Sequence, residues 1–215
     1  GLPLQAVSAG VSDPGVAARV ARAVDDLDQV VRDIRGTIFE LRHTGGESLQ
    51  AQVRSLVREY ARFLGWAPVV RIEGPVDTAV PPEISNLANL EELYIGHGPL
   101  KDLPPEIGDL PNLSTLNVFA TFLERLPPEI GNLRNLKRLG LCNIGFTPVP
   151  ALPPEIGELS NLIDLFICGN KLTNLPPEIG DLGNLTELSL IGNMLTSLPA
   201  EIGRLKELEN LHIAG

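Results

Sequence analysis

The apolar positions from residue 81 onward repeat with a fixed period. The pair Glu-Ile, followed by a small residue and then by Leu-x-x-Leu, occurs six times at intervals of 23, 23, 26, 23 and 23 residues. The six copies begin at Glu83, Glu106, Glu129, Glu155, Glu178 and Glu201. A repeat this short cannot bury its own apolar face, so successive repeats must stack on one another. The pattern predicts a solenoid with one long surface for binding other macromolecules.

Within one repeat, the spacing of apolar residues predicts a short strand followed by a turn. Leu162, Leu165 and Ile167 are expected to point inward from a strand of a parallel sheet. Asn170 is expected to hydrogen-bond the backbone of adjacent turns. The core behind the strand is predicted to hold Leu172, Leu175, Ile179 and Leu182.

The full repeat, Leu-x-x-Leu-x-Ile-x-x-Asn-x-Leu-x-x-Leu-Pro-Pro-Glu-Ile-Gly-x-Leu, resembles the leucine-rich repeat family over residues 81–215. The residue pattern of the repeat is similar to that of the intracellular class of leucine-rich repeats in bacteria and plants. The resemblance implies an α/β fold, a curved parallel sheet in a solenoid of about six to seven repeats. It also implies a protein–protein interaction scaffold rather than an enzyme.

Two departures from the repeat pattern stand out. The position of Asn170 is kept by Asn193 but is taken by Gly98, Thr121 and Ile144 in earlier repeats. The third repeat carries three extra residues between positions 145 and 152. This insertion is either a functional loop or a tolerated surface insertion, because surface loops accept extra length at little cost.

Side chains that alternate with the inward leucines face the concave side of the predicted sheet. They form an apolar centre with a polar rim, an arrangement typical of interfaces. The alternative is a scatter of apolar residues that a strand surface tolerates without a partner. The predicted partner-binding residues are Tyr94, Asn117, Phe119, Arg138, Cys142, Asp164, Phe166, Cys168, Glu187 and Ile191, with Glu92 as a further acid at the rim.

The composition changes near residue 80. Residues 1–80 contain no Lys and no Asn, whereas residues 81–215 contain four Lys and thirteen Asn. We expect a helical segment over 1–66, with helices over about 14–42 and 48–64, and a solenoid over 67–215. Residues 67–80 fit the repeat as a degenerate first copy, in which Val69–Glu73 is the first strand and the second helix caps its open end.

The first predicted helix carries a heptad pattern of apolar residues. These dimerisation candidates are Val20, Val24, Leu27, Val31, Ile34, Ile38 and Leu41. They are expected either to pair with a second copy or to pack on the helix over 48–64. A second route to a homodimer is an open strand edge at the C-terminal end of the sheet.

Four segments of residues 1–80 resemble sensor histidine kinases with GAF domains: Gly1 to Gln5, Ala23 to Gln29, Asp33 to Leu41 and Glu73 to Thr78. The resemblance implies part of a dimerisation hairpin and the entry strand of an ATP-binding domain. The phosphoacceptor histidine and the nucleotide-binding motifs of that family have no counterpart, so no residue inherits a catalytic role. Two alternative hypotheses follow: a regulatory remnant of a two-component sensor, and a fusion without an evolved partner.

Charge and composition narrow the partners. The net charge is −10, and residues 81–215 hold eight basic and seventeen acidic residues. This excess of acid argues against nucleic acid and anionic membranes and favours a basic or neutral protein, unless it serves only solubility. Two cysteines in 215 residues indicate a reducing compartment, which we take to be the cytoplasm. No motif for a metal, a cofactor or catalysis is recognised.

Overall fold

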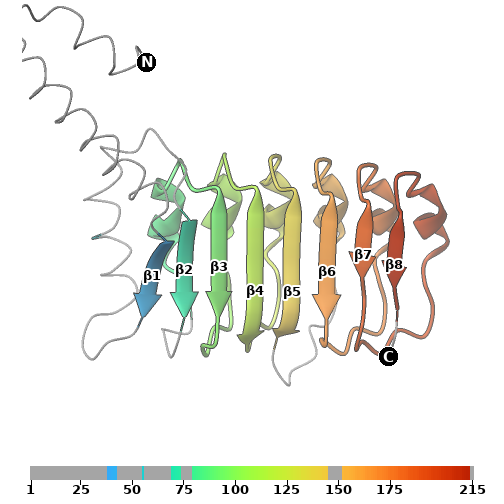
Figure 1. Ribbon diagram of the computed structural model, residues 1–215, viewed down its shortest axis with the longest axis horizontal. Helices are drawn as coiled ribbons and strands as arrows, with labels where there is room; N and C mark the ends of the chain where they lie inside the picture. The colour runs from blue at the N-terminus through green and yellow to red at the C-terminus, as the bar shows by residue number, and fades with distance from the viewer. Residues whose placement is uncertain (1–37, 43–54, 56–68, 74–78, 145–151, 214–215) are drawn as a thin grey trace, which may run out of the picture. The chain divides into compact units, whose positions relative to one another are not determined.

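Eight parallel strands lie side by side in chain order in one sheet (Figure 1). The computed structural model describes residues 38–42, 55, 69–73, 79–144 and 152–213. The strands are β1 (Ile38–Arg42), β2 (Val69–Glu73), β3 (Glu92–Gly96), β4 (Thr115–Thr121), β5 (Arg138–Ile144), β6 (Asp164–Cys168), β7 (Glu187–Ser189) and β8 (Asn210–His212). The predicted leucine-rich repeat solenoid is therefore confirmed.

A short 3-10 helix follows each strand from β2 to β7, and Figure 1 shows these helices on one side of the sheet. They are η2 (Pro82–Asn86), η3 (Pro105–Asp109), η4 (Pro128–Asn132), η5 (Pro154–Glu158), η6 (Pro177–Asp181) and η7 (Ala200–Arg204). Each begins after an extended proline, and five have a second proline at the first helical position. Proline has its φ set for a helix and lacks an N–H that would go unpaired there, so the Pro-Pro pair defines the helix start.

The core is a continuous stack of leucine, isoleucine and valine between the sheet and the 3-10 helices. In the repeat used above, Leu162, Leu165 and Ile179 are at most 1% exposed. The register advances by one whole repeat per strand, so that Leu93 pairs with Leu116 and Leu116 with Leu139. Each layer of the core thus repeats the residue type of the layer before it.

The asparagine ladder exists where the sequence keeps asparagine. The Nδ2 atom of Asn170 donates to the carbonyl of Leu141 at 2.5 Å, and the side chain is 1% exposed. Asn193 accepts from the amides of Asn170 and Leu172 at 3.3 and 3.1 Å. In the earlier repeat, the buried hydroxyl of Thr121 has no hydrogen-bond partner among the described residues.

A second ladder of asparagines joins the repeats on the helical side of the sheet. Asn112, Asn135, Asn161 and Asn184 each donate from Nδ2 to a carbonyl of the preceding repeat, at 2.6 to 2.8 Å. The 3-10 helices also stack closely through their glycines. A Cβ added to Gly131 would lie 2.7 Å from the carbonyl oxygen of Glu155, whereas one added to Gly203 would meet nothing. A side chain on the stacking glycines of η3 to η6 would therefore collide with the next repeat, whereas η2 has Ser85 at the same position.

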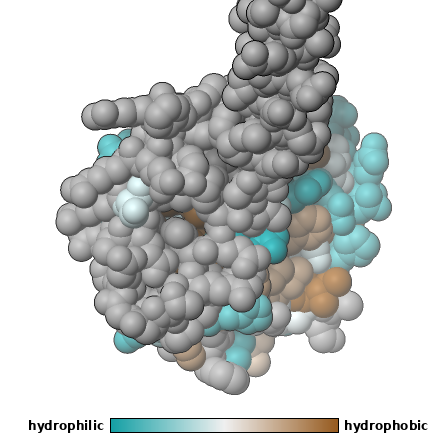
Figure 2. Space-filling view, turned by 60° about the vertical axis from the view of Figure 1, so that its left-hand side comes forward, coloured by the Kyte–Doolittle hydropathy of each residue, from teal (hydrophilic) through white to brown (hydrophobic). Residues whose placement is uncertain are grey.

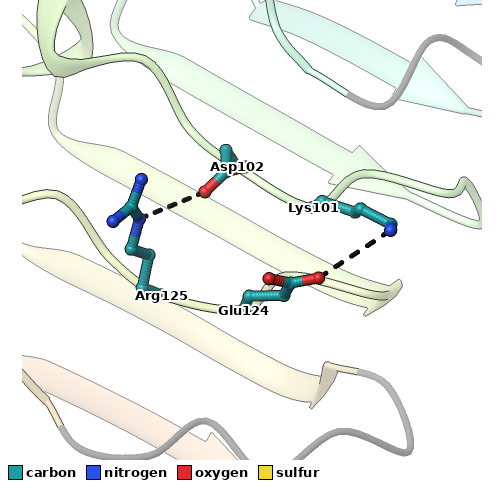
Figure 3. Close-up of polar contacts among 4 residues, drawn as sticks. All are labelled: Lys101, Asp102, Glu124 and Arg125. Atoms are coloured by element: carbon teal, nitrogen blue, oxygen red, sulfur yellow. Dashed lines mark hydrogen bonds and ion pairs between the residues drawn. The ribbon is translucent and has the colours of Figure 1, made fainter.

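Between strands and 3-10 helices, the chain also pairs at single residues. Isolated parallel bridges join Ala79 to Asp102 and Asp102 to Arg125. Two ion pairs cross the same pair of repeats: Arg125 with Asp102 at 3.3 Å and Lys101 with Glu124 at 3.9 Å (Figure 3). All four side chains are about half exposed or more, so these pairs contribute little to stability.

Two expectations for the N-terminal part need correction. Residues Ile38–Arg42 form β1, which pairs in parallel with β2, so the helix predicted over 14–42 cannot extend to residue 42. The sheet also begins before the boundary predicted at residue 67, and Val69–Glu73 is its second strand rather than its first. A β-branched residue and an aromatic residue, Ile38 and Phe39, favour the strand over a helix here.

The remaining N-terminal expectations lie largely outside the described residues. Ser55 is helical and exposed, and the rest of the helix predicted over 48–64 lies outside them. So do residues 145–151 of the insertion in the third repeat, and five dimerisation candidates: Val20, Val24, Leu27, Val31 and Ile34. The other two, Ile38 and Leu41, are strand residues of β1.

Candidate functional site

The side of the sheet that faces away from the 3-10 helices, called the strand face below, is the concave face of the sequence prediction. The register places the predicted side chains in neighbouring rows, as the spacing of the leucines required. One row holds Arg71, Tyr94, Asn117, Gly140, Phe166, Ser189 and His212; the rows beside it hold Glu92, Thr115, Arg138, Asp164 and Glu187, and Gly96, Phe119, Cys142 and Cys168. Ile191 lies two residues after β7. The role of these residues in binding stays a prediction.

The apolar side chains of the strand face are largely half-buried. Phe119 and Phe166 are half-buried, as are Cys142 and Cys168, whereas Ile191 is 44% exposed. Figure 2 shows hydrophobic residues gathered beside hydrophilic ones on the part of the surface that the structure describes. A patch of this composition is typical of protein interfaces.

Some of the predicted polar residues are already occupied by contacts within the chain. The Tyr94 hydroxyl donates to Oε2 of Glu92 at 3.0 Å, and the guanidinium of Arg71 lies 5.3 Å from the centre of the Tyr94 ring. Burial, together with the hydrogen bond to Glu92, raises the pKa of Tyr94 above its ordinary value. Arg138 pairs with Asp164 at 2.9 Å. These side chains are therefore less available to a partner than the sequence suggested.

Two glycines of the strand face set the orientation of their neighbours. A Cβ on Gly96 would collide with the ring of Phe119, and a Cβ on Gly140 would collide with Oδ1 of Asn117. The Phe119 ring also meets the His97 ring edge to face, with centres 5.1 Å apart. Sequence reasoning missed these arrangements, although a glycine at a strand-face position was a usable signal for a close approach.

The two cysteines are register partners on β5 and β6 and are both free thiols. The Cys168 sulfur lies 3.5 Å from the hydroxyl oxygen of Ser189. Burial raises the pKa of the Cys142 thiol to about 11, so this thiol stays protonated at neutral pH. Among the described residues, no three His, Cys, Asp or Glu side chains gather as a metal site would require.

A hollow that sequence reasoning missed lies at the carboxyl ends of β3 and β4. It has a volume of about 450 Å³ and is lined by His97, Gly98, Pro99, Ala120 and Phe122. Phe122 is 45% exposed, and both His97 and Ala120 adopt the left-handed conformation, with φ of 56° and 50°. This conformation is costly for residues other than glycine, and a glycine, Gly169, adopts it at the equivalent position of a later repeat.

Comparisons with known proteins agree with this fold. Residues 130–215 match a family model described as a leucine-rich repeat region. No curated protein matches the sequence. None of the described helices is both long and apolar enough to cross a membrane.

Three solved structures are similar to the chain. A leucine-rich repeat protein of Leptospira interrogans is 25% identical, with a TM-score of 0.53, and the match covers 83% of this chain and 55% of that one. The plant peptide hormone receptor RGFR1, solved in complex with RGF2, is 32% identical, with a TM-score of 0.54 and coverages of 68% and 23%. An internalin of Listeria monocytogenes is 20% identical, with a TM-score of 0.57 and coverages of 82% and 48%. The chain thus spans about half or less of each of these proteins.

Proposed function

We propose that this chain is a non-catalytic scaffold that binds a segment of another protein on the strand face, between β4 and β7. The observation that carries the proposal is a set of half-buried or exposed side chains there that form no side-chain hydrogen bond or ion pair with a described residue: Asn117, Phe119, Phe166, Glu187 and Ile191. Aromatic anchors surrounded by polar groups supply most of the affinity at protein interfaces.

The stacked architecture supports this function. Each repeat contributes one strand to a continuous surface, and the described hollows are shallow grooves between repeats. One similar structure is a plant peptide hormone receptor in complex with RGF2, so a fold of this kind presents a surface to a peptide. A role in signalling and a cytoplasmic location are parts of the same hypothesis, and the free thiols of Cys142 and Cys168 favour a reducing compartment.

Selection from a random-peptide library tests the proposal. Peptides selected on the wild-type chain are then measured by calorimetry on two variants with equal added charge. The first is Phe119→Glu with Phe166→Glu on the strand face, and the second is Asn86→Glu with Asn132→Glu on the exposed ends of η2 and η4.

We expect the strand-face variant to lose at least tenfold in affinity, since each buried aromatic anchor contributes on the order of 1–2 kcal/mol. The variant on η2 and η4 should bind as the wild type does. Equal losses in both variants, or peptides that bind neither face specifically, would refute a binding role for the strand face. Circular dichroism and the urea midpoint confirm that both variants remain folded.

A further inference from the structure

Two strands carry the same arrangement on the strand face: an acid and, two residues later, an aromatic ring. These are Glu92 and Tyr94 on β3, and Asp164 and Phe166 on β6. On β3 the ring has a cation beside it, because the register partner of Tyr94 on the preceding strand is Arg71. On β3, an acid and an aromatic ring two residues apart on the strand thus already have a guanidinium beside the ring.

Beside Phe166 on β6, the preceding strand contributes no side chain at the position that matches Arg71. The register partner of Phe166 on the preceding strand is Gly140. Asn117 lies on β4, on the far side of Gly140 from Phe166, and its side-chain amide leans over Gly140 and presents its Oδ1 there. No described residue donates a hydrogen bond to this Oδ1, and Phe166 lacks the hydroxyl by which Tyr94 engages Glu92.

The charges around Phe166 favour an incoming cation. Asp164 is paired with Arg138 at 2.9 Å, so these two groups neutralise each other. Glu187, the register partner of Asp164 on β7, is half-buried and forms no ion pair with any residue that the structure describes. Adjacent strands lie about 4.8 Å apart, which puts Glu187 within reach of a long basic side chain that lies over Phe166.

We propose that Phe166, Asn117 and Glu187 receive one arginine side chain of the bound partner, in the position that Arg71 occupies beside Tyr94. This inference rests on the proposed function and names the partner's chemistry. Arginine fits better than lysine, because a planar guanidinium stacks on an aromatic ring and still directs N–H donors to an amide oxygen and a carboxylate. The net charge of −9 on residues 81–215 draws a basic segment toward the solenoid.

The direct test uses N-acetyl-arginine methylamide as the probe, with the uncharged isostere N-acetyl-citrulline methylamide as its control. Titrations are followed by NMR of the Asn117 side-chain amide and the Phe166 ring in the full chain. Phe166→Leu removes the aromatic ring, and Phe166→Tyr keeps a ring at this position. Glu187→Gln removes the charge, and Glu209→Gln is the matched loss of charge at an exposed position.

We expect the arginine probe to shift both resonances and the citrulline probe to leave them unchanged. Phe166→Leu and Glu187→Gln should each weaken binding roughly two- to fivefold, Phe166→Tyr should weaken it less than Phe166→Leu because it keeps a ring, and Glu209→Gln should bind like the wild type. Equal shifts with citrulline, or shifts spread over the acidic helices without change at Asn117 and Phe166, would overturn the inference.

The selected peptides separate this inference from the proposed function. Peptides that bind the strand face through an arginine, and that bind at least twofold more weakly when it is replaced by citrulline, support the inference. Peptides that bind the strand face without any dependence on a basic residue overturn it and leave the proposed function standing. A library that yields no strand-face binder refutes the proposed function, and the NMR titration then still decides whether the arginine position exists.

Discussion

The early and late repeats of the solenoid differ at the turn that follows each strand. In the late repeats, Gly169 and Gly192 adopt the left-handed conformation and are followed by the ladder residues Asn170 and Asn193. In the early repeats, His97 and Ala120 adopt that conformation, and Gly98 and Thr121 stand at the ladder positions. The early repeats therefore lack the hydrogen bonds between an asparagine side chain and the backbone, and they accept strain at the carboxyl ends of the strands.

The helical side of the same repeats shows no such difference. The second asparagine ladder, on the helical side, runs from Asn112 to Asn184, and the helix glycines from Gly108 to Gly180 contact the next repeat in the same way. From Asn112 to Asn184 the stacking contacts on the helical side therefore recur from repeat to repeat, while the turns after the strands do not. The comparison teaches that stacking is maintained over these repeats even where the turns depart from the most stable arrangement.

Removal of a side chain from the ladder of Asn170 and Asn193 in the late repeats should have the largest effect on stability. Asn170→Ala leaves buried backbone groups without a partner and should lower the free energy of unfolding by about 2–3 kcal/mol. The control is Asn174→Ala, an exposed residue whose amide donates to the neighbouring Thr173 hydroxyl, with an expected change within about 0.5 kcal/mol. Urea denaturation measures both, and equal losses would show that the ladder does not stabilise the late repeats.

Helix stacking should respond equally in early and late repeats. Gly131→Ala and Gly157→Ala place a methyl group against the carbonyl oxygens of Glu155 and Glu178, at 2.7 and 2.6 Å, and should each cost about 1–3 kcal/mol. Gly203→Ala meets no atom and should be neutral or stabilising by up to about 1 kcal/mol. Thermal unfolding would contradict the uniform stacking if only one of the two crowded variants were destabilised.

An early repeat should gain stability when its unpaired polar group is removed. Thr121→Val replaces a buried hydroxyl that has no partner among the described residues with a methyl group of the same shape, and should stabilise the fold by about 1 kcal/mol. Thr186→Val serves as the control, because the Thr186 hydroxyl donates to the carbonyl of Ile163 at 3.3 Å. A gain in the control as large as that in Thr121→Val would remove this distinction between the repeats.

The smallest effect is expected from the ion pairs of the early repeats. The late repeats carry Thr173 and Asn174 where the early ones carry Lys101 and Asp102. Asp102→Asn breaks the exposed pair with Arg125 and should change the free energy of unfolding by less than about 0.5 kcal/mol, with the difference vanishing in high salt. A loss above about 1 kcal/mol would mean that these pairs, absent from the late repeats, compensate for the missing ladder.

The sequence predicted the solenoid and its register because repetition constrains both. A shift of one residue would turn every leucine row out of the core, so the positions of Leu93, Leu116 and Leu139 could be aligned without a structure. The end of the first helix was wrongly predicted, because the heptad spacing of Ile38 and Leu41 was preferred over the apolar–polar–apolar alternation of Phe39, Glu40 and Leu41, which is the pattern of a strand.

Parts of the candidate site could not be predicted from spacing alone. Spacing places a side chain on a face but says nothing of its rotamer, so the lean of Phe119 over Gly96 and of Asn117 over Gly140 was not foreseen. The pairing of Arg138 with Asp164 likewise depends on side-chain conformation. The second asparagine ladder was also missed, although an asparagine that recurs at one position of the repeat is what a hydrogen-bonded stack requires.

Site-directed photocrosslinking tests most directly whether the strand face is the binding surface. A photoreactive benzoylphenylalanine replaces Phe166 in one protein and the exposed Asn132 of η4 in another, and each is irradiated with the peptides selected on the wild-type chain. We predict that peptide adducts form at position 166 and not at position 132. Adducts at position 132 with equal or greater yield would place the partner on the helical side and contradict the proposed function.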